Sequence, residues 1–240
     1  MEHELAVPVA DADALAVEAA GYVAGRARAA VGARGRFTFA VSGGHTPWAM
    51  FAALATEDVP WADVQLFQVD ERVAPDGDSS RNLTNLRKSI GDAPATVYPM
   101  PVNDADMDVA ADRYADVLPS RFDLVHLGLG PDGHTASLVP GDPVLSVTGA
   151  LVAVTQPYQG QRRMTLTYPA LARADQLLWL ISGADKRNPL SRLLAGDQSI
   201  PAGRVHAARS LVLADAAAAP DTAAGPDTGA GPDTSPAHDR

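Results

Sequence analysis

The chain has 240 residues, a formal net charge of −10 and no cysteine. The lack of cysteine excludes disulfides, thiolate nucleophiles and cysteine metal sites, and it fits a reducing compartment. The acidic excess argues against non-specific nucleic-acid binding. No apolar run approaches the roughly 20 residues of a membrane helix, and the N-terminus lacks a signal-peptide pattern. We therefore expect a cytoplasmic protein that binds neither nucleic acid nor membrane.

The chain alternates between helical and strand-like segments from its N-terminus onward. Alanine-rich or amphipathic segments predict helices at 11–30, 48–55, 82–90, 104–118 and 183–194. Apolar, β-branched or aromatic runs predict strands at 36–42, 64–69, 97–98, 122–129, 150–155, 163–167, 176–182 and 206–213. This alternation indicates an α/β fold, with an open, mostly parallel, Rossmann-like sheet and helices on both of its faces.

The strands supply the expected core, and the C-terminus is expected to lie outside it. The core positions are Phe39, Val41, Leu66, Phe67, Val69, Leu124, Val125, Leu127, Leu178, Leu180 and Ile181. From Asp215 onward the chain repeats Pro-Asp-Thr and has too few apolar side chains to offset the cost of ordering. We therefore predict one domain over 1–214 and a disordered tail over 215–240.

Four of the predicted strands end in polar or glycine-rich turns. These turns read SGGHTP, DER, GPDGHTAS and SGADK. In an open α/β sheet the ligand crevice lies outside the carboxyl ends of the strands. The four turns are therefore expected to meet at one site.

The third turn, GPDGHTAS, contains the side chains best suited to catalysis. Gly128, Gly130 and Gly133 match the dinucleotide pattern G-x-G-x-x-G. The context does not fit that use, because no helix follows directly and no acidic residue stands about 20 residues further on. Two interpretations of His134 remain open. It is a general base whose ring Asp132 orients or whose charged form Asp132 stabilises, or it only caps a helix further on or forms a hydrogen bond within the turn.

The other turns offer groups that could hold an anion. Ser42, Gly43 and Gly44 precede a helix, so they form either a phosphate cradle or an ordinary tight turn. The cations Arg72, Arg81, Arg163 and Lys186 are either surface charges or a grip on a phosphorylated substrate. Asp70 could serve as a base, accept a sugar hydroxyl or pair with an arginine. No histidine spacing suggests a metal, and no G-x-S-x-G motif supports a serine hydrolase.

The four turns together are more specific than any one of them. VSGGHTP, FQVDERVAPDGDSSRN, FDLVHLGLGPDGHTASLVPG and RRMTLTYPAL…LLWLISGADK resemble the 6-phosphogluconolactonase family over about residues 5–213. The resemblance implies hydrolysis of 6-phospho-D-glucono-1,5-lactone to 6-phospho-D-gluconate in the oxidative pentose phosphate pathway. It also implies a sugar-phosphate-isomerase type of fold and a reaction without metal or organic cofactor.

The resemblance also implies roles for individual residues. His134 would activate the attacking water, and Asp132 would orient the His134 ring. Arg72 or nearby backbone N–H groups would stabilise the oxyanion. The residues that match the family's phosphate and sugar grip are Ser42, Gly43, Gly44, Arg163 and Lys186, with Arg81 and Asn82 as weaker candidates.

Two alternatives within the same fold remain. Glucosamine-6-phosphate isomerases/deaminases share the G-x-D-G-H turn, but they continue with a run of the type GHIAFNEP, whose glutamate takes part in ring opening. This chain reads GHTASLVP and has Val139 at that position. A sugar-phosphate sensor is the other alternative, and such sensors usually carry an attached DNA-binding module.

Overall fold

Parallel strands form the main sheet of the molecule. The computed structural model describes residues 2–220, and within them the sheet has the order β1-β10-β9-β6-β2-β3-β5. All of its strand pairs are parallel. The strands are β1 (Glu4–Leu5), β2 (Phe37–Val41), β3 (Val64–Gln68), β5 (Thr96–Tyr98), β6 (Leu124–Leu127), β9 (Gln176–Ile181) and β10 (Arg209–Ala214). The predicted α/β class is confirmed, whereas β1 was not predicted.

A second, antiparallel sheet was not predicted. Its order is β4-β8-β7, and its strands are β4 (Asp70–Arg72), β8 (Arg163–Leu166) and β7 (Val152–Val154). The prediction of Asp70–Arg72 as a plain turn is therefore wrong, because Asp70 pairs with Thr165 and Arg72 with Arg163 across the sheet. A three-residue polar strand has no apolar alternation by which it could be recognised.

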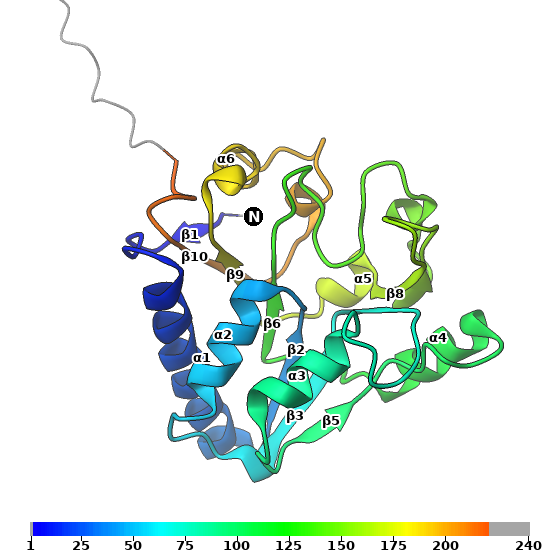
Figure 1. Cartoon of the computed structure of the whole chain (residues 1–240), viewed down its shortest axis with the longest axis horizontal. Coiled ribbons are helices and arrows are strands. Elements are labelled where there is room, and N and C mark those ends of the chain that lie inside the picture. Colours follow the sequence, from blue (N-terminus) through cyan, green and yellow to red (C-terminus); the bar gives the residue numbers. More distant parts are fainter. Residues whose placement is uncertain (1, 221–240) are drawn as a thin grey trace, which may run out of the picture.

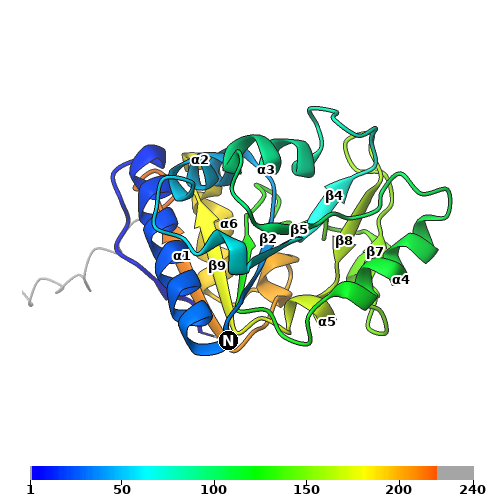
Figure 2. The ribbon, with the colours of Figure 1, turned by 90° about the horizontal axis from the view of Figure 1, so that it is seen from below.

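Helices cover both faces of the main sheet. They are α1 (Ala12–Arg34), α2 (His45–Leu54), α3 (Asn82–Ile90), α4 (Met107–Val117), α5 (Tyr168–Leu171) and α6 (Arg187–Leu194). Helices α1, α2 and α3 share one apolar cluster, while α4, α5 and α6 belong to the cluster on the opposite face. In Figures 1 and 2, α1 and α2 lie side by side, and α4 and the small sheet lie at the end away from α1.

Strand β9 shows how the sequence builds this double-sided core. Leu178 and Leu180 face the cluster of α1 and α2, whereas Leu177, Trp179 and Ile181 face the other cluster. A strand covered on both faces needs apolar side chains at every position, which explains its continuous apolar run. Every predicted core residue is buried.

The strand order places the four turns together. From β2 the chain proceeds to β3 and β5 on one side, and then returns to β6 on the other side of β2. This change of direction opens a crevice beyond the carboxyl ends of β2 and β6. Ser42 follows the end of β2, and the 128–134 turn follows the end of β6.

The ordered domain extends beyond the predicted boundary at 214. Asp215 is 3% exposed, and its carboxylate accepts hydrogen bonds from Ser182 Oγ (2.5 Å), the Gly183 N–H (3.2 Å) and the Ala218 N–H (2.8 Å). Ala218 is fully buried. The predicted tail therefore begins too early, and the rest of it, 221–240, lies outside the described residues.

No helix within residues 2–220 combines the length and apolar character needed to cross a bilayer.

The contacts of Asp215 predict a sharp difference between two truncated chains. Ending the chain at Ala214 should lower the free energy of unfolding by about 2–4 kcal/mol relative to ending it at Pro220, since several charge-assisted hydrogen bonds are lost. Urea denaturation of both chains measures this difference. Equal unfolding midpoints would show that residues 215–220 do not stabilise the fold.

Candidate active site

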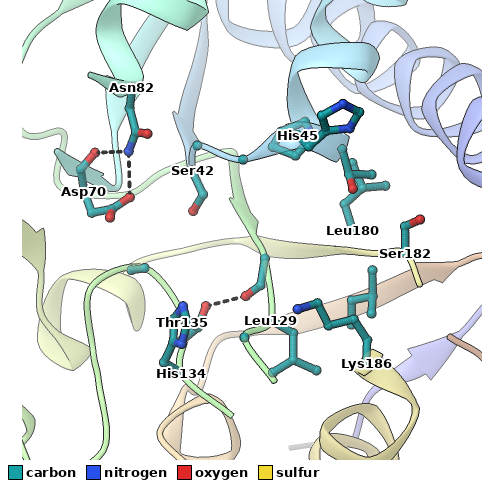
Figure 3. Close-up of a pocket in the computed structure, with 18 of the residues that line it drawn as sticks. Ser42, His45, Asp70, Asn82, Leu129, His134, Thr135, Leu180, Ser182 and Lys186 are labelled. Atoms are coloured by element: carbon teal, nitrogen blue, oxygen red, sulfur yellow. Dashed lines mark hydrogen bonds between the residues drawn. The ribbon is translucent and has the colours of Figure 1, made fainter. Parts of the chain in front are cut away.

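A cavity of about 390 Å³ lies at the carboxyl edge of the main sheet. It is lined by residues from all four predicted turns, and Figure 3 shows many of them. The predicted site residues that line it are Ser42, Gly43, Gly44, Asp70, Arg72, Asn82, His134, Arg163 and Lys186. Asp132 and Arg81 do not line the cavity. The cavity walls thus carry three cations and one carboxylate.

Asp132 holds the imidazole of His134 in one orientation. His134 Nδ1 lies 2.5 Å from Asp132 Oδ1, and the His134 N–H donates to the same oxygen at 3.1 Å. Burial would raise the pKa of Asp132, but the hydrogen bonds and charge of His134 outweigh it and lower that pKa. An ionised carboxylate can only accept a hydrogen bond, so Nδ1 carries the proton. In the neutral ring, the free lone pair is therefore on Nε2.

Gly130 provides the surface on which this imidazole rests. A Cβ at position 130 would collide with Nδ1, Cε1 and Cγ of His134. The Gly130 N–H also donates to the His134 carbonyl at 2.8 Å, which closes the turn. The glycine that makes the turn resemble a nucleotide motif is thus needed for close packing against the histidine.

Asp70 is a buried carboxylate at the edge of the cavity. Its Oδ2 accepts a hydrogen bond from Ser137 Oγ at 2.6 Å, and its Oδ1 accepts one from Asn82 Nδ2 at 3.2 Å (Figure 3 draws the second). Burial raises the pKa of Asp70, while the Ser137 hydrogen bond, Arg163 and Arg72 oppose the rise. Ser137 was missed in the sequence, because nothing local links it to a residue 67 positions away.

A fully buried glutamate next to Asp70 organises this side of the cavity. Glu71 Oε1 accepts from the N–H groups of Arg72 and Asn82, and Oε2 accepts from Leu83 N–H and Gln68 Nε2, all at 2.7–2.9 Å. Arg81 Nε lies 3.0 Å from Oε2, as an ion pair whose angle is poor for a hydrogen bond. Arg81 is therefore placed to support the site from within the protein.

Through this network Glu71 fixes the start of α3 and the side chain of Asn82. The first two N–H groups of the helix point at the Glu71 carboxylate, which caps the helix and complements its dipole. Asn82 Oδ1 then accepts from Arg72 Nη1 at 2.9 Å. A Cβ at Gly43 would collide with the Asn82 amide, so the Ser42–Gly44 loop packs directly on this residue.

The fully buried His126 anchors the same loop from β6. Its Nδ1 accepts from the Ser42 N–H at 3.3 Å, and its carbonyl accepts from Ser42 Oγ at 3.0 Å. Burial lowers the pKa of His126 to about 3, so the ring is neutral at physiological pH. These contacts give His126 a structural role.

The two ends of the cavity differ in character. In Figure 3, His134, Asp70 and Asn82 lie toward one end, and His45, Ser182 and Lys186 lie toward the other. Helix α2 begins at the second end with no side-chain cap on its N-terminal N–H groups. Uncapped N–H groups and a lysine together attract an anion. Asp215 supports this end because it binds the Ser182–Gly183 turn that precedes Lys186.

Arg163 projects into the cavity from β8. Its side chain is 5% exposed, and burial lowers the pKa of the guanidinium. Within residues 2–220, its buried Nε has no hydrogen-bond partner. A buried guanidinium with an unused donor suits a ligand oxygen.

The fold and this cavity define an α/β protein with a basic small-molecule site at the carboxyl edge of its sheet. The chain matches the model of the family described as glucosamine-6-phosphate isomerases/6-phosphogluconolactonase over residues 10–213. The chain therefore belongs to this family, and the predicted resemblance is confirmed.

Several similar proteins are named 6-phosphogluconolactonase. A 6-phosphogluconolactonase of Mycobacterium tuberculosis (strain ATCC 25618 / H37Rv) is 36% identical over 233 residues, covering 87% of this chain and 94% of the relative. One of Synechocystis sp. is 37% identical over 180 residues, covering 69% of this chain and 75% of the relative. The crystal structure of a 6-phosphogluconolactonase from Shewanella baltica OS155 superposes with a TM-score of 0.81 at 26% identity, covering 90% of this chain and 98% of that chain.

The buried pair of Glu71 and Arg81 predicts a large effect of one substitution. Glu71→Ala should lower the free energy of unfolding by about 3–5 kcal/mol, because it removes the buried partner of the Arg81 guanidinium and the acceptor of four buried hydrogen bonds. Chemical denaturation measures this loss. The matched control is Asp76→Ala, which removes the 82% exposed carboxylate on the other side of Arg81 and should cost about 0–1 kcal/mol. Similar losses in both variants would contradict the role assigned to Glu71.

Proposed function

We propose that the protein hydrolyses 6-phospho-D-glucono-1,5-lactone to 6-phospho-D-gluconate in the cytoplasm, as a step of the oxidative pentose phosphate pathway. The observation that carries the proposal is the imidazole of His134, held by Asp132 at the edge of a cavity with three cations. Family membership and the names of the similar proteins support the substrate.

The two ends of the cavity suggest how the substrate lies. The phosphate is placed at the uncapped start of α2, where Ser42, Gly43, Gly44 and Lys186 surround it. The lactone ring then extends toward His134, with its carbonyl near the guanidinium groups of Arg72 and Arg163. The carboxylate of Asp70 accepts a hydrogen bond from a sugar hydroxyl.

The reaction uses His134 first as a base and then as an acid. Nε2 takes a proton from water as the water oxygen attacks the lactone carbonyl carbon, and Arg72 and Arg163 stabilise the oxyanion that forms. The intermediate collapses by breaking the bond between this carbon and the ring oxygen. The ring oxygen leaves with the proton from Nε2 and becomes a hydroxyl group. The new carboxylic acid then releases its proton to solvent.

The wall near His134 is less suited to the deaminase reaction. Val139, at the position of the deaminase glutamate, is 7% exposed and is not among the residues that line the cavity. An aliphatic side chain carries no proton, so ring opening would lack this group. Release of ammonia from glucosamine 6-phosphate by the protein would overturn this part of the proposal.

The role of His134 can be tested by kinetics. His134→Ala should lower kcat for freshly prepared lactone by about 10²–10⁴-fold, because general-base catalysis is lost. Acid release is followed with the spontaneous rate subtracted, and His206→Ala, which changes an exposed histidine outside the cavity, serves as the control. Unchanged catalysis in His134→Ala would remove this residue from the mechanism. A wild type no faster than background would remove the lactonase function itself.

The phosphate end can be tested separately. Lys186→Ala should raise KM by about 10-fold or more with a smaller change in kcat, since one charge-assisted contact to the phosphate is lost. The control is Lys88→Ala, because Lys88 is exposed on α3 and does not line the cavity. If KM stays the same in Lys186→Ala, the phosphate is held elsewhere.

A further inference from the structure

Tyr158 stands at the tip of the hairpin that joins β7 and β8. Its N–H donates to the Gln161 carbonyl at 3.0 Å, and the Gln161 N–H donates back at 3.2 Å. The two residues between them, Gln159 and Gly160, have φ angles of 52° and 80°. Two central residues with positive φ define a type I′ turn, whose twist matches that of the flanking strands. The backbone of Tyr158 is therefore held in a well-defined position.

The side chain of Tyr158 contacts three groups of the candidate site. Its hydroxyl donates to Asp132 Oδ2 at 3.4 Å. Its ring packs edge-on against the His134 imidazole, with centroids 5.6 Å apart and an interplanar angle of 65°. The Arg163 guanidinium lies over the same ring, with Cζ 5.1 Å from the centroid. One side chain thus joins the 128–134 turn to strand β8.

These contacts complement those already described for Asp132. Its Oδ1 accepts both hydrogen bonds from His134, whereas Oδ2 accepts from the tyrosine. Burial and the negative charge of Asp132 raise the pKa of Tyr158, so the hydroxyl keeps its proton and remains a donor. A carboxylate held at both oxygens resists rotation, and it therefore keeps Nδ1 of His134 as its partner.

Tyr158 acts from outside the cavity. It is absent from the residues that line the cavity, whereas His134 and Arg163 both line it. Its ring supports the imidazole by an aromatic contact and the guanidinium by a cation–π contact. A residue with this placement can set the geometry of the reacting groups without touching the substrate.

We propose that Tyr158 is a positioning residue for the lactone hydrolysis proposed above, on which this inference rests: its hydroxyl fixes Asp132, and its ring fixes His134 and Arg163. The sequence does not reveal this role, because the residue lies 24 positions after His134 in a turn with no recognisable motif.

The test compares Tyr158→Ala and Tyr158→Phe with Gln156→Ala, an exposed position in the same hairpin. In lactone hydrolysis, Tyr158→Ala should lower kcat about 10-fold and raise KM about 3-fold, because both His134 and Arg163 lose their support. Tyr158→Phe should restore KM and leave kcat about 3-fold low, because only the hydroxyl is missing. Wild-type constants in Tyr158→Ala, no recovery of KM in Tyr158→Phe, or equal losses in Gln156→Ala would each overturn the proposal.

A second readout separates this proposal from the proposed function. The NMR resonances of the His134 ring should shift and broaden in Tyr158→Ala, whereas those of His206 should not. Unchanged His134 resonances would contradict positioning even if the wild type is active. A wild type without lactonase activity would contradict the proposed hydrolysis. The His134 resonances in Tyr158→Ala would then still show whether Tyr158 holds the imidazole in place.

Discussion

The carboxylate of Glu71 has no contact with solvent, and four hydrogen-bond donors and one arginine surround it. A buried charge is tolerated only when its partners are held in place. Because those partners come from the end of β3, from β4 and from the start of α3, the carboxylate links the main sheet, the small sheet and a helix. Asp70, Arg72 and Asn82 are each next to one of these contacts. The geometry of one wall of the cavity thus depends on a residue that does not line it.

A different constraint shapes the glycine-rich turns around the cavity, namely the close approach of backbone to side chain. At Gly130 the imidazole of His134 rests on the peptide, and at Gly43 the amide of Asn82 does the same. Any other residue at these positions would displace the group that it meets. The glycine-rich turns therefore position particular side chains around the ligand, and a nucleotide phosphate is not needed to explain them.

Much of the fold and part of the site could be predicted from the sequence. The two-sided apolar runs identified the core strands, and parallel pairing required that their carboxyl ends meet, so His134, Asp70 and Lys186 were correctly brought to one cavity. The small sheet, Glu71, Ser137 and Tyr158 were missed, because their roles depend on tertiary contacts without a local pattern. Asp215 was assigned to the tail since composition alone cannot reveal that one carboxylate binds the Ser182–Gly183 turn.

We propose that the sugar phosphate binds with its phosphate at the start of α2 and its reacting carbon beside His134. A crystal structure with bound 6-phosphogluconate tests this most directly. We expect the phosphate within hydrogen-bond distance of Lys186 and the N–H groups of Gly44 and His45, and the product carboxylate about 3 Å from Nε2 of His134. A product bound in the reverse direction, with its phosphate beside His134 and its carboxylate at Lys186, would contradict the account.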